Sequence, residues 1–299
     1  MNSLVYQCSA ANTSFVIKGY AQNRTSDHDR FTSEVQFLTY AQIAANEFVP
    51  KLLQADVESR CIVLEFLEGD AYEEGSTPSA EDIAKALDFV RAMNADRLAA
   101  RNAISCRAAD GFLFLTEHLA DIELRIKQMA FEHLHVSLSD EAKTLIAQLK
   151  AKHQELQKNT SRGILTGAVT DALTPDQTCL SPSDFGFHNA IRTSKGVRFI
   201  DFEFAGWDDP SKAVIDFDLQ PRVPLTPKVR HLRWAIPWWG PRHDDRSVAL
   251  YPILRLKWAC IVASPLVHDR YKTLIRGHTI SSAAEHVQAK IRLAHTFLH

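Results

Sequence analysis

The stretch that decides the fold is residues 180–209, LSPSDFGFHNAIRTSKGVRFIDFEFAGWDD. Two short apolar runs, residues 190–193 and 197–200, flank a Ser-Lys-Gly turn, and this pattern predicts a β-hairpin. Asn189 directly precedes the first predicted strand, and Asp201 directly follows the second. Because an antiparallel hairpin returns its two open ends to the same place, we expect these two side chains to lie close together.

A third oxygen-bearing side chain precedes the hairpin. Asp184 lies five residues before Asn189, on the segment that leads into the first strand. Together with Asn189 and Asp201, it gives this short segment two carboxylates and one amide oxygen. These hard oxygen ligands suit Mg²⁺ better than zinc or copper. The stretch therefore predicts a magnesium-binding hairpin.

The composition is that of an ordinary globular protein. With 299 residues the chain can bury a large core, as one large domain or as two lobes. Its formal net charge of −2 argues against a nucleic-acid partner, because surfaces that bind nucleic acid are usually basic. No apolar run is long enough to span a membrane, and the first residues have neither the basic nor the apolar region of a secretion signal.

Five cysteines are scattered along the chain, odd in number and without a CxxC pair. We therefore expect reduced thiols in a cytoplasmic protein rather than disulfides or a zinc site.

The first part of the chain is predicted to be rich in strands. The predicted elements are strands at residues 4–9 and 14–20, a helix at 29–46, and strands at 51–56 and 61–66. Lys18 falls in the second strand and Glu34 in the first turn of the helix. Taken alone, a lysine in a strand is usually a solvated surface residue, and a glutamate there suits the helix dipole.

Helical spacing dominates beyond residues 73–78, EEGSTP, which have the composition of a linker. Ser79 resembles the cap of a helix. Further helices are predicted near residues 112–132, from residue 137, and in two segments from residue 247 to the end. We expect the region 221–241, rich in Pro and Trp, to be irregular.

With these elements in order, the chain resembles the aminoglycoside phosphotransferase and choline kinase group, small-molecule kinases that share the protein-kinase-like fold. The resemblance runs from about Leu4 to Asp218, and its strongest element is SDFGFHN, followed by IDFEFAG and IDFD. It implies an α+β fold of two lobes. Residues 1–68 would form a small β-rich nucleotide-binding lobe, and residues 69–299 a larger helical lobe that carries the catalytic loop and the hairpin.

The resemblance also implies roles for single residues. In kinase-like folds a catalytic-loop Asp is followed five residues later by an Asn, and a second Asp lies at the end of the next hairpin. Asp184 would accordingly be the catalytic base, with Asn189 and Asp201 as Mg²⁺ ligands. Lys18 would contact the α and β phosphates of ATP, and Glu34 would fix Lys18 by an ion pair.

Two further matches concern the nucleotide and the catalytic loop. Glu65, Phe66 and Leu67 match the hinge, whose backbone groups would bind adenine. Asp216 occupies the place of the Asp that braces the catalytic loop in this group.

The chain departs from the group's pattern at the catalytic loop. The usual His-Gly-Asp is replaced by Pro182, Ser183 and Asp184, so the support that the His gives the loop is missing. His188 either replaces it or is a structural histidine behind the site, and we favour the structural interpretation.

A second departure concerns the nucleotide lobe. The group's first strand and most of its Gly-rich loop should precede Leu4, so we expect this lobe to lack both. There is also no segment ending in Ala-Pro-Glu after Asp201, which argues against a protein kinase and for a small-molecule acceptor.

The acceptor is less well defined by the sequence. Trp234, Trp238 and Trp239 either stack on a cationic or sugar substrate or pack the protein core. Asp208 and Asp209 either bind an amine or sugar hydroxyls, or form a solvated turn. We expect a hydroxylated small metabolite as acceptor: a sugar, an amino alcohol or an aminoglycoside-like compound.

The sequence thus predicts an enzyme that uses ATP and Mg²⁺ to phosphorylate a hydroxyl of a small molecule. The alternative is a non-catalytic pseudokinase that serves as a binding or scaffold module. It is favoured by the missing Gly-rich loop and by the replacement of His-Gly with Pro182 and Ser183.

Overall fold

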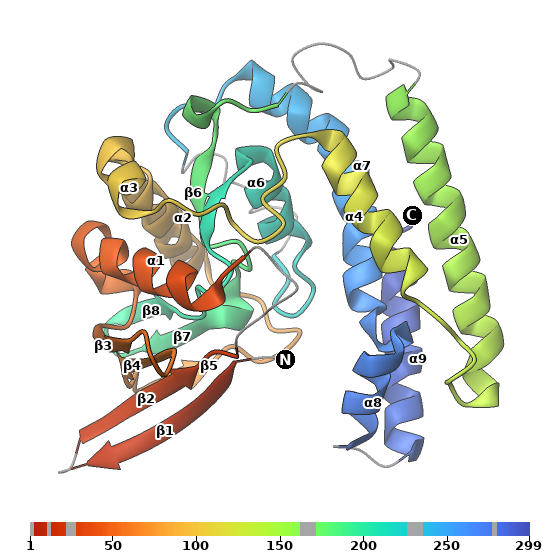
Figure 1. The fold of residues 1–299 in the computed structure, drawn as a ribbon, viewed down its shortest axis with the longest axis horizontal. Helices are drawn as coiled ribbons and strands as arrows, with labels where there is room; N and C mark the ends of the chain where they lie inside the picture. Colours follow the sequence, from red (N-terminus) through yellow and green to blue (C-terminus); the bar gives the residue numbers. More distant parts are fainter. Residues whose placement is uncertain (1–2, 11–12, 22–27, 162–171, 226–235, 277–279) are drawn as a thin grey trace. The chain divides into compact units, whose positions relative to one another are not determined.

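The structure is a computed structural model that describes residues 3–10, 13–21, 28–161, 172–225, 236–276 and 280–299 (Figure 1). The chain divides into two compact units. Unit 1 comprises residues 1–111 and 173–240, and unit 2 comprises residues 112–172 and 241–299. The predicted boundary between residues 68 and 69 falls inside unit 1, and the division into two lobes there stays a prediction.

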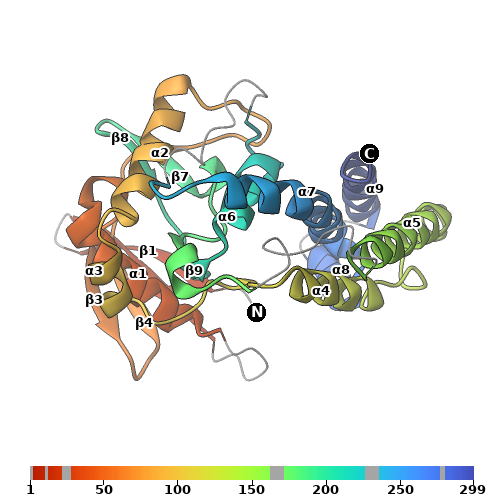
Figure 2. The same ribbon diagram turned by 90° about the horizontal axis from the view of Figure 1, so that it is seen from above.

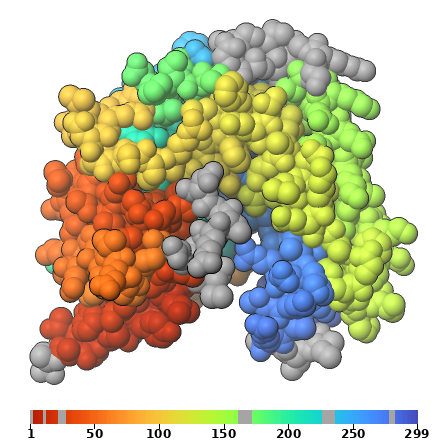
Figure 3. Space-filling view, in the orientation of Figure 1, coloured from red at the N-terminus to blue at the C-terminus, as the bar shows by residue number. Residues whose placement is uncertain are grey.

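Unit 1 contains a four-stranded antiparallel sheet in the order β1-β2-β4-β3. Its strands are β1 (Leu4–Ala10), β2 (Thr13–Gly19), β3 (Leu52–Asp56) and β4 (Cys61–Glu65). All four were predicted from the sequence, with ends within two residues. β1 is an edge strand with exposed side chains at Leu4, Val5 and Tyr6, and the red N-terminal strands lie at the surface in the view of Figure 3. Lys18 lies opposite Ile62, in the middle of the sheet.

Helix α1 (Arg30–Ala44) connects the two halves of this sheet. It begins after Asp29, whose side chain accepts a hydrogen bond from the backbone N–H of Phe31 and so caps the helix. Its buried face carries Phe37 and Leu38 and, among these apolar residues, Glu34. A carboxylate on the buried face of a helix requires a polar or charged partner. We therefore expect Glu34 to contact such a partner inside unit 1.

The predicted hairpin is present, as β7 (Ala190–Thr193) and β8 (Gly196–Phe199). The register pairs Ala190 with Phe199 and Thr193 with Gly196, so the second strand lies one residue earlier than predicted. The short strand β5 (Asp70–Ala71) pairs with β7, and β6 (Cys179–Ser181) pairs with β9 (Gly206–Asp208). A 3-10 turn, η4 (Phe187–Asn189), leads into β7.

Three further α-helices are described in unit 1, α2 (Ala80–Met93), α3 (Arg97–Ala103) and α6 (Pro210–Leu219). The predicted cap of α2 is confirmed, because Ser79 and Asp82 form a reciprocal capping box. The sequence analysis missed α3 and α6. The signal for α6 was available: Asp209 is its N-cap, and Pro210 occupies its first turn.

A cluster of buried aromatic side chains fixes the hairpin against helices α1 and α2. Ring centroids of Phe37 and Phe202 lie 4.7 Å apart, and those of Phe89 and Phe199 lie 5.2 Å apart. Phe185, on the catalytic loop, lies 4.9 Å from Phe199. These five rings come from α1, α2, the loop before β7, the last residue of β8 and the segment that follows β8. Their packing therefore holds together the segments that carry the predicted site residues.

Unit 2 is helical in its described part (Figure 1, Figure 2). It comprises α4 (Leu115–Lys127), α5 (Val136–Ser161), α7 (Pro241–Val262), α8 (His268–Arg276) and α9 (Ile280–Thr296). Helices α4, α5 and α9 each pack on α7. The prediction of two helices from residue 247 was wrong, because three are present and the first begins at Pro241. No helix in the described ranges is long and apolar enough to cross a membrane.

Candidate active site

A buried lysine from β2 forms the centre of the candidate site. Lys18 Nζ lies 2.6 Å from Glu34 Oε2, 2.5 Å from Asp201 Oδ1 and 3.5 Å from Glu203 Oε2. The Lys18 side chain is only 6% exposed. It is therefore not a solvated surface residue, as a lysine in a strand usually is. The ion pair between Lys18 and Glu34 that the resemblance implies is present, although its role toward a nucleotide stays a prediction.

The charges in this cluster stabilise one another. Burial lowers the pKa of Lys18, but the carboxylates of Glu34 and Asp201 outweigh burial, and the net pKa is raised. Lys18 therefore remains protonated. Burial raises the pKa of Glu34, and the contact with Lys18 opposes that shift only in part. Tyr20 also donates a hydrogen bond to Glu34 Oε2 at 2.7 Å, which holds the carboxylate in place.

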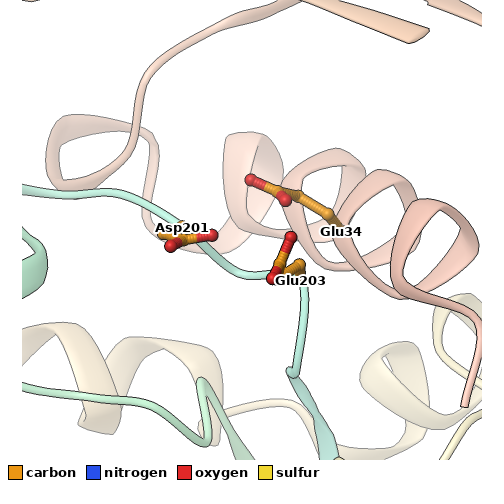
Figure 4. Close-up of side chains that lie close together, drawn as sticks. All are labelled: Glu34, Asp201 and Glu203. Atoms are coloured by element: carbon orange, nitrogen blue, oxygen red, sulfur yellow. The ribbon is translucent and has the colours of Figure 1, made fainter. Parts of the chain in front are cut away.

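Three carboxylates converge at this point, from Glu34, Asp201 and Glu203 (Figure 4). One oxygen atom from each lies within 4.8 Å of the others. Asp201 is the most accessible of the three, with 41% of its side chain exposed, and its φ of +67° lies in the left-handed region. A non-glycine residue held in that region indicates strain that the surrounding structure maintains, which is common at functional sites.

Glu203 is a site residue that the sequence analysis missed. It follows Asp201 by two residues, and the two carboxylates meet where Asp201 has left-handed backbone and Glu203 lies in a turn. The alternation of side chains along a strand does not apply here, so the Asp-x-Glu spacing alone gave no signal for this contact. Glu203 is fixed by Arg30, whose Nη1 lies 3.2 Å from Oε1, and by a hydrogen bond from the Ser3 hydroxyl.

The donor set fits a hard divalent cation. Carboxylate oxygens are the ligands that Mg²⁺ and Ca²⁺ prefer, and the exposure of Asp201 makes the cluster accessible from solvent. Lys18 supplies a positive charge within the cluster, which limits the repulsion among the three carboxylates.

The predicted catalytic loop places Asp184 and Asn189 in direct contact. Asn189 Nδ2 donates to the backbone oxygen of Asp184 at 3.0 Å and lies 3.4 Å from Asp184 Oδ2. The backbone oxygen of Asn189 accepts from Ile200 N at 2.9 Å, so the open ends of the hairpin meet. The predicted approach of the Asn189 and Asp201 side chains stays a prediction. Asn189 thereby lies beside the residue that precedes Asp201.

The side chain of Asp184 has a histidine partner. His188 Nε2 lies 3.1 Å from Asp184 Oδ1. Burial raises the pKa of Asp184, but the contact with His188, the contact with Asn189 and the positive charge of Arg222 together outweigh burial, and the net pKa is lowered. Asp184 is therefore a carboxylate at neutral pH, as a proton acceptor must be.

Serine residues support the loop backbone where the group's His-Gly is replaced. Ser183 has a φ of +67°, and its N–H donates to Ser181 Oγ at 3.0 Å. The Ser183 hydroxyl donates to the backbone oxygen of Ala109 at 3.3 Å. These two bonds hold a left-handed residue directly before Asp184, so the loop has support despite the missing histidine.

Asp208 and Asp209 fit neither of the two interpretations from the sequence, which were a ligand-binding pair and a solvated turn. Both are fully buried, so they do not form a solvated turn. Asp208 Oδ2 lies 2.7 Å from Lys212 Nζ, and Asp209 caps α6. Burial raises the pKa of Asp208 to about 6, opposed by Lys212. Asp216 Oδ2 also lies 3.1 Å from Lys212 Nζ, and the predicted bracing of the catalytic loop by Asp216 stays a prediction.

The predicted hinge lies at the end of β4. The side chain of Glu65 accepts from Lys51 N at 3.1 Å and lies 3.3 Å from Arg198 Nη2, so it is held on the sheet. Phe66 and Leu67 follow as half-buried coil between β4 and β5. Their contact with adenine stays a prediction.

The predicted aromatic cluster is described only in part. Trp234 lies outside the described residues. Trp238 and Trp239 are half-buried and pack against the core of unit 1, and the Arg97 guanidinium lies 4.0 Å from the centroid of the Trp238 ring. This arrangement favours the packing interpretation for these two residues.

No protein-family model and no curated protein matches the sequence. Solved structures do match over nearly the whole chain. A spectinomycin phosphotransferase in complex with ADP and spectinomycin has a TM-score of 0.61 at 9% identity, covering 99% of this chain and 90% of that one.

Two other matching structures are enzymes whose names give substrates other than spectinomycin. A choline kinase from Streptococcus pneumoniae has a TM-score of 0.57 at 12% identity, covering 98% of this chain and 89% of that one. A macrolide 2'-phosphotransferase from Brachybacterium faecium has a TM-score of 0.52 at 12% identity, covering 95% and 88%. Similarity at these identities establishes the fold, not the acceptor. The chain therefore has the α+β, protein-kinase-like fold of the small-molecule phosphotransferases.

Proposed function

We propose that this protein is a phosphotransferase that moves the γ-phosphoryl group of ATP to a hydroxyl of a small molecule. The observation that carries the proposal is the contact of one buried lysine, Lys18, with Glu34 on α1 and Asp201 at the end of the hairpin. Their convergence, 16 and 183 residues away in the chain, is typical of a site that binds phosphate and metal.

Lys18 would bind the α and β phosphates, and Glu34 would hold it in position. The backbone of Glu65, Phe66 and Leu67 would bind the adenine. ATP as donor is supported by the fold, which the spectinomycin phosphotransferase structures bound to ADP and AMP share.

Asp201 and Asn189 would hold Mg²⁺. The amide Nδ2 of Asn189 is already bonded to the Asp184 backbone, which leaves its Oδ1 as the atom for a cation. Glu203 adds a carboxylate beside Asp201. Bound Mg²⁺ would supply neutralisation of the charge on the phosphate oxygens.

Asp184 would act on the acceptor. The acceptor oxygen forms a bond to the γ-phosphorus, the bond to the bridging oxygen breaks to release ADP, and the hydroxyl proton passes to Asp184. The lowered pKa of Asp184 keeps this carboxylate free of a proton before the transfer.

The acceptor class is a small hydroxylated compound: a sugar, an amino alcohol or an aminoglycoside-like molecule. It is supported by the matched structures, whose names include kinases of choline and ethanolamine and phosphotransferases of spectinomycin and macrolides.

The test is ATP consumption in the presence of a panel of such acceptors. Asp184→Ala is expected to lower acceptor-dependent turnover by at least about 100-fold, because it removes the general base. Asp269→Ala, at an exposed aspartate of unit 2, is the matched control and should leave turnover unchanged. Acceptor-dependent turnover that survives Asp184→Ala would contradict the mechanism.

The second candidate is a non-catalytic pseudokinase, favoured by Pro182 and Ser183 in the place of His-Gly. Calorimetric titration with ATP, with and without Mg²⁺, separates the two. Metal-dependent binding supports the enzyme. Absence of binding, in a protein shown to be folded, supports the scaffold.

A further inference from the structure

The imidazole of His188 lies behind an accessible carboxylate. The His188 side chain is 4% exposed, whereas that of Asp184 is 44% exposed. His188 Nε2 lies 3.1 Å from Asp184 Oδ1. Since a carboxylate can only accept, Nε2 carries the proton of this hydrogen bond. The ring thus contacts Asp184 from the protein interior and leaves its outer side open.

The position of the ring is built into the loop. A Cβ on Gly186 would lie 2.8 Å from His188 Nδ1 and 3.1 Å from its Cε1, so the ring packs directly on the glycine backbone. Gly186 has extended backbone, and space, not an unusual dihedral angle, is what requires a glycine here. His188 Nδ1 is buried and has no hydrogen-bond partner among the described residues. The bond to Asp184 therefore sets the orientation of the ring.

The second carboxylate oxygen of Asp184, Oδ2, is held less tightly than Oδ1. Its contact with Asn189 Nδ2 is 3.4 Å, whereas the same nitrogen bonds the Asp184 backbone oxygen at 3.0 Å. A contact of that length contributes little as a hydrogen bond. Oδ2 consequently keeps the capacity to accept a proton, and Oδ1 is the oxygen that the protein holds.

We propose that His188 is a positioning residue that holds Asp184 through Oδ1 so that Oδ2 faces the acceptor hydroxyl. The proposal rests on the proposed phosphotransferase function. Serine bonds support the loop backbone before Asp184, and His188 orients the side chain from the residues after it. In the family that the sequence resembles, one histidine before the Asp supports this loop. Here the two serine hydrogen bonds and the His188 hydrogen bond would share that role.

The kinetic test compares two substitutions that differ in the donor. His188→Leu fills similar space without an N–H, and His188→Gln keeps an amide N–H near the position of Nε2. Loss of orientation should lower kcat by about 10- to 100-fold in His188→Leu, with the KM for ATP changed by less than about twofold. His188→Gln should recover most of the lost kcat. Equal kcat in wild type and His188→Leu would overturn the proposal, as would an equal loss in both variants.

A third variant, at Gly186, moves the His188 imidazole but leaves the histidine itself unchanged. Gly186→Ala introduces the Cβ that meets Nδ1 and Cε1, so it should displace His188 and lower kcat as His188→Leu does. A thermal unfolding scan of each variant tests whether the protein is folded, so that a lower kcat is not mistaken for unfolding. Unchanged kcat in a folded Gly186→Ala would contradict the need for this ring position.

A readout independent of turnover separates this proposal from the proposed function. In ¹⁵N-labelled protein, the Nε2 proton of His188 should give a protected resonance that shifts or disappears in Asp184→Ala. His153, whose Nε2 lies 2.9 Å from the Leu119 backbone oxygen, is the internal control and should not change. If the wild type turns over no ATP, the proposed function fails, and this resonance alone decides whether His188 holds Asp184. A His188 resonance unaffected by Asp184→Ala would overturn the inference.

Discussion

Lys18 Nζ on β2 lies 2.5 Å from Asp201 Oδ1, although 183 residues separate them in the chain. This contact joins the four-stranded sheet to the end of the β7–β8 hairpin. Glu34, on α1, contacts the same nitrogen at 2.6 Å, so one ammonium group links three segments of unit 1. Because the lysine and Glu34 are buried, the contact has consequences for stability as well as for ligand binding.

The first prediction concerns the loss of this ammonium group. Lys18→Met leaves Glu34 buried without its positive partner, and the free energy of unfolding should fall by about 3–5 kcal/mol. ATP binding should be lost as well. Denaturant unfolding and calorimetry measure the two effects.

A double variant separates stability from binding. Lys18→Met combined with Glu34→Gln should regain much of the lost stability, because it removes the buried charge, but it should not bind ATP. Lys195→Met, at an exposed lysine of the hairpin turn, is the matched control and should change stability by less than about 0.5 kcal/mol. ATP affinity that survives in the double variant would contradict the phosphate-binding role of Lys18.

The second prediction concerns the metal. Asp201→Asn keeps the shape of the side chain, and asparagine tolerates the left-handed backbone that this position requires. The variant should fold, since its side chain is partly exposed, but it should lose the increase in ATP affinity that Mg²⁺ gives the wild type. Calorimetric titrations with and without Mg²⁺ measure this difference. An unchanged Mg²⁺ effect would show that Asp201 is not a ligand.

The parts of the site that the sequence predicted depend on local pattern. A turn between two short apolar runs was enough to predict the hairpin, and hairpin geometry placed Asn189 next to the segment of Asp201. The elements that carry Lys18 and Glu34 were also predicted from periodicity. Their contact was implied by the resemblance alone, since periodicity carries no information about which buried charges meet.

The parts that were missed depend on tertiary context. Asp208 and Asp209 had the composition of a solvated turn, because adjacent charges without a visible partner favour solvent. Their burial is possible because α6 places Lys212 four residues after Asp208, within 2.7 Å. That helix was not predicted, so the partner was not recognised. Glu203 was missed for a similar reason, since its carboxylate joins the cluster only through the left-handed backbone at Asp201 and the turn that follows it.

The third prediction tests this buried cluster. Lys212 contacts Asp208 at 2.7 Å and Asp216 at 3.1 Å, and all of its side chain but 2% is buried. Lys212→Met should therefore lower the free energy of unfolding by about 3–5 kcal/mol, since it leaves Asp208 buried without its counter-charge. Lys272→Met, at an exposed lysine near Asp269, should cost less than about 0.5 kcal/mol. Urea unfolding of the two variants measures the contrast, and similar small losses in both would contradict it.

The fourth prediction concerns acid stability at the start of α1. A hydrogen bond from Arg60 lowers the pKa of Asp29 to about 2, from an ordinary value of 3.8. The folded state therefore binds this proton less tightly than the unfolded state. The ion pair stabilises the protein above the ordinary pKa, and this contribution is lost as the pH falls from about 5 toward 2.

Asp29→Asn isolates the charge, because asparagine also caps helices. The pair is partly exposed and screened by solvent, so the variant should lose less than about 1 kcal/mol at pH 7. The difference in unfolding free energy should narrow below about pH 5 and should also shrink in 1 M NaCl. Denaturant unfolding of both proteins across this pH range measures it. A difference that stays constant with pH and salt would show that Asp29 acts through its cap alone.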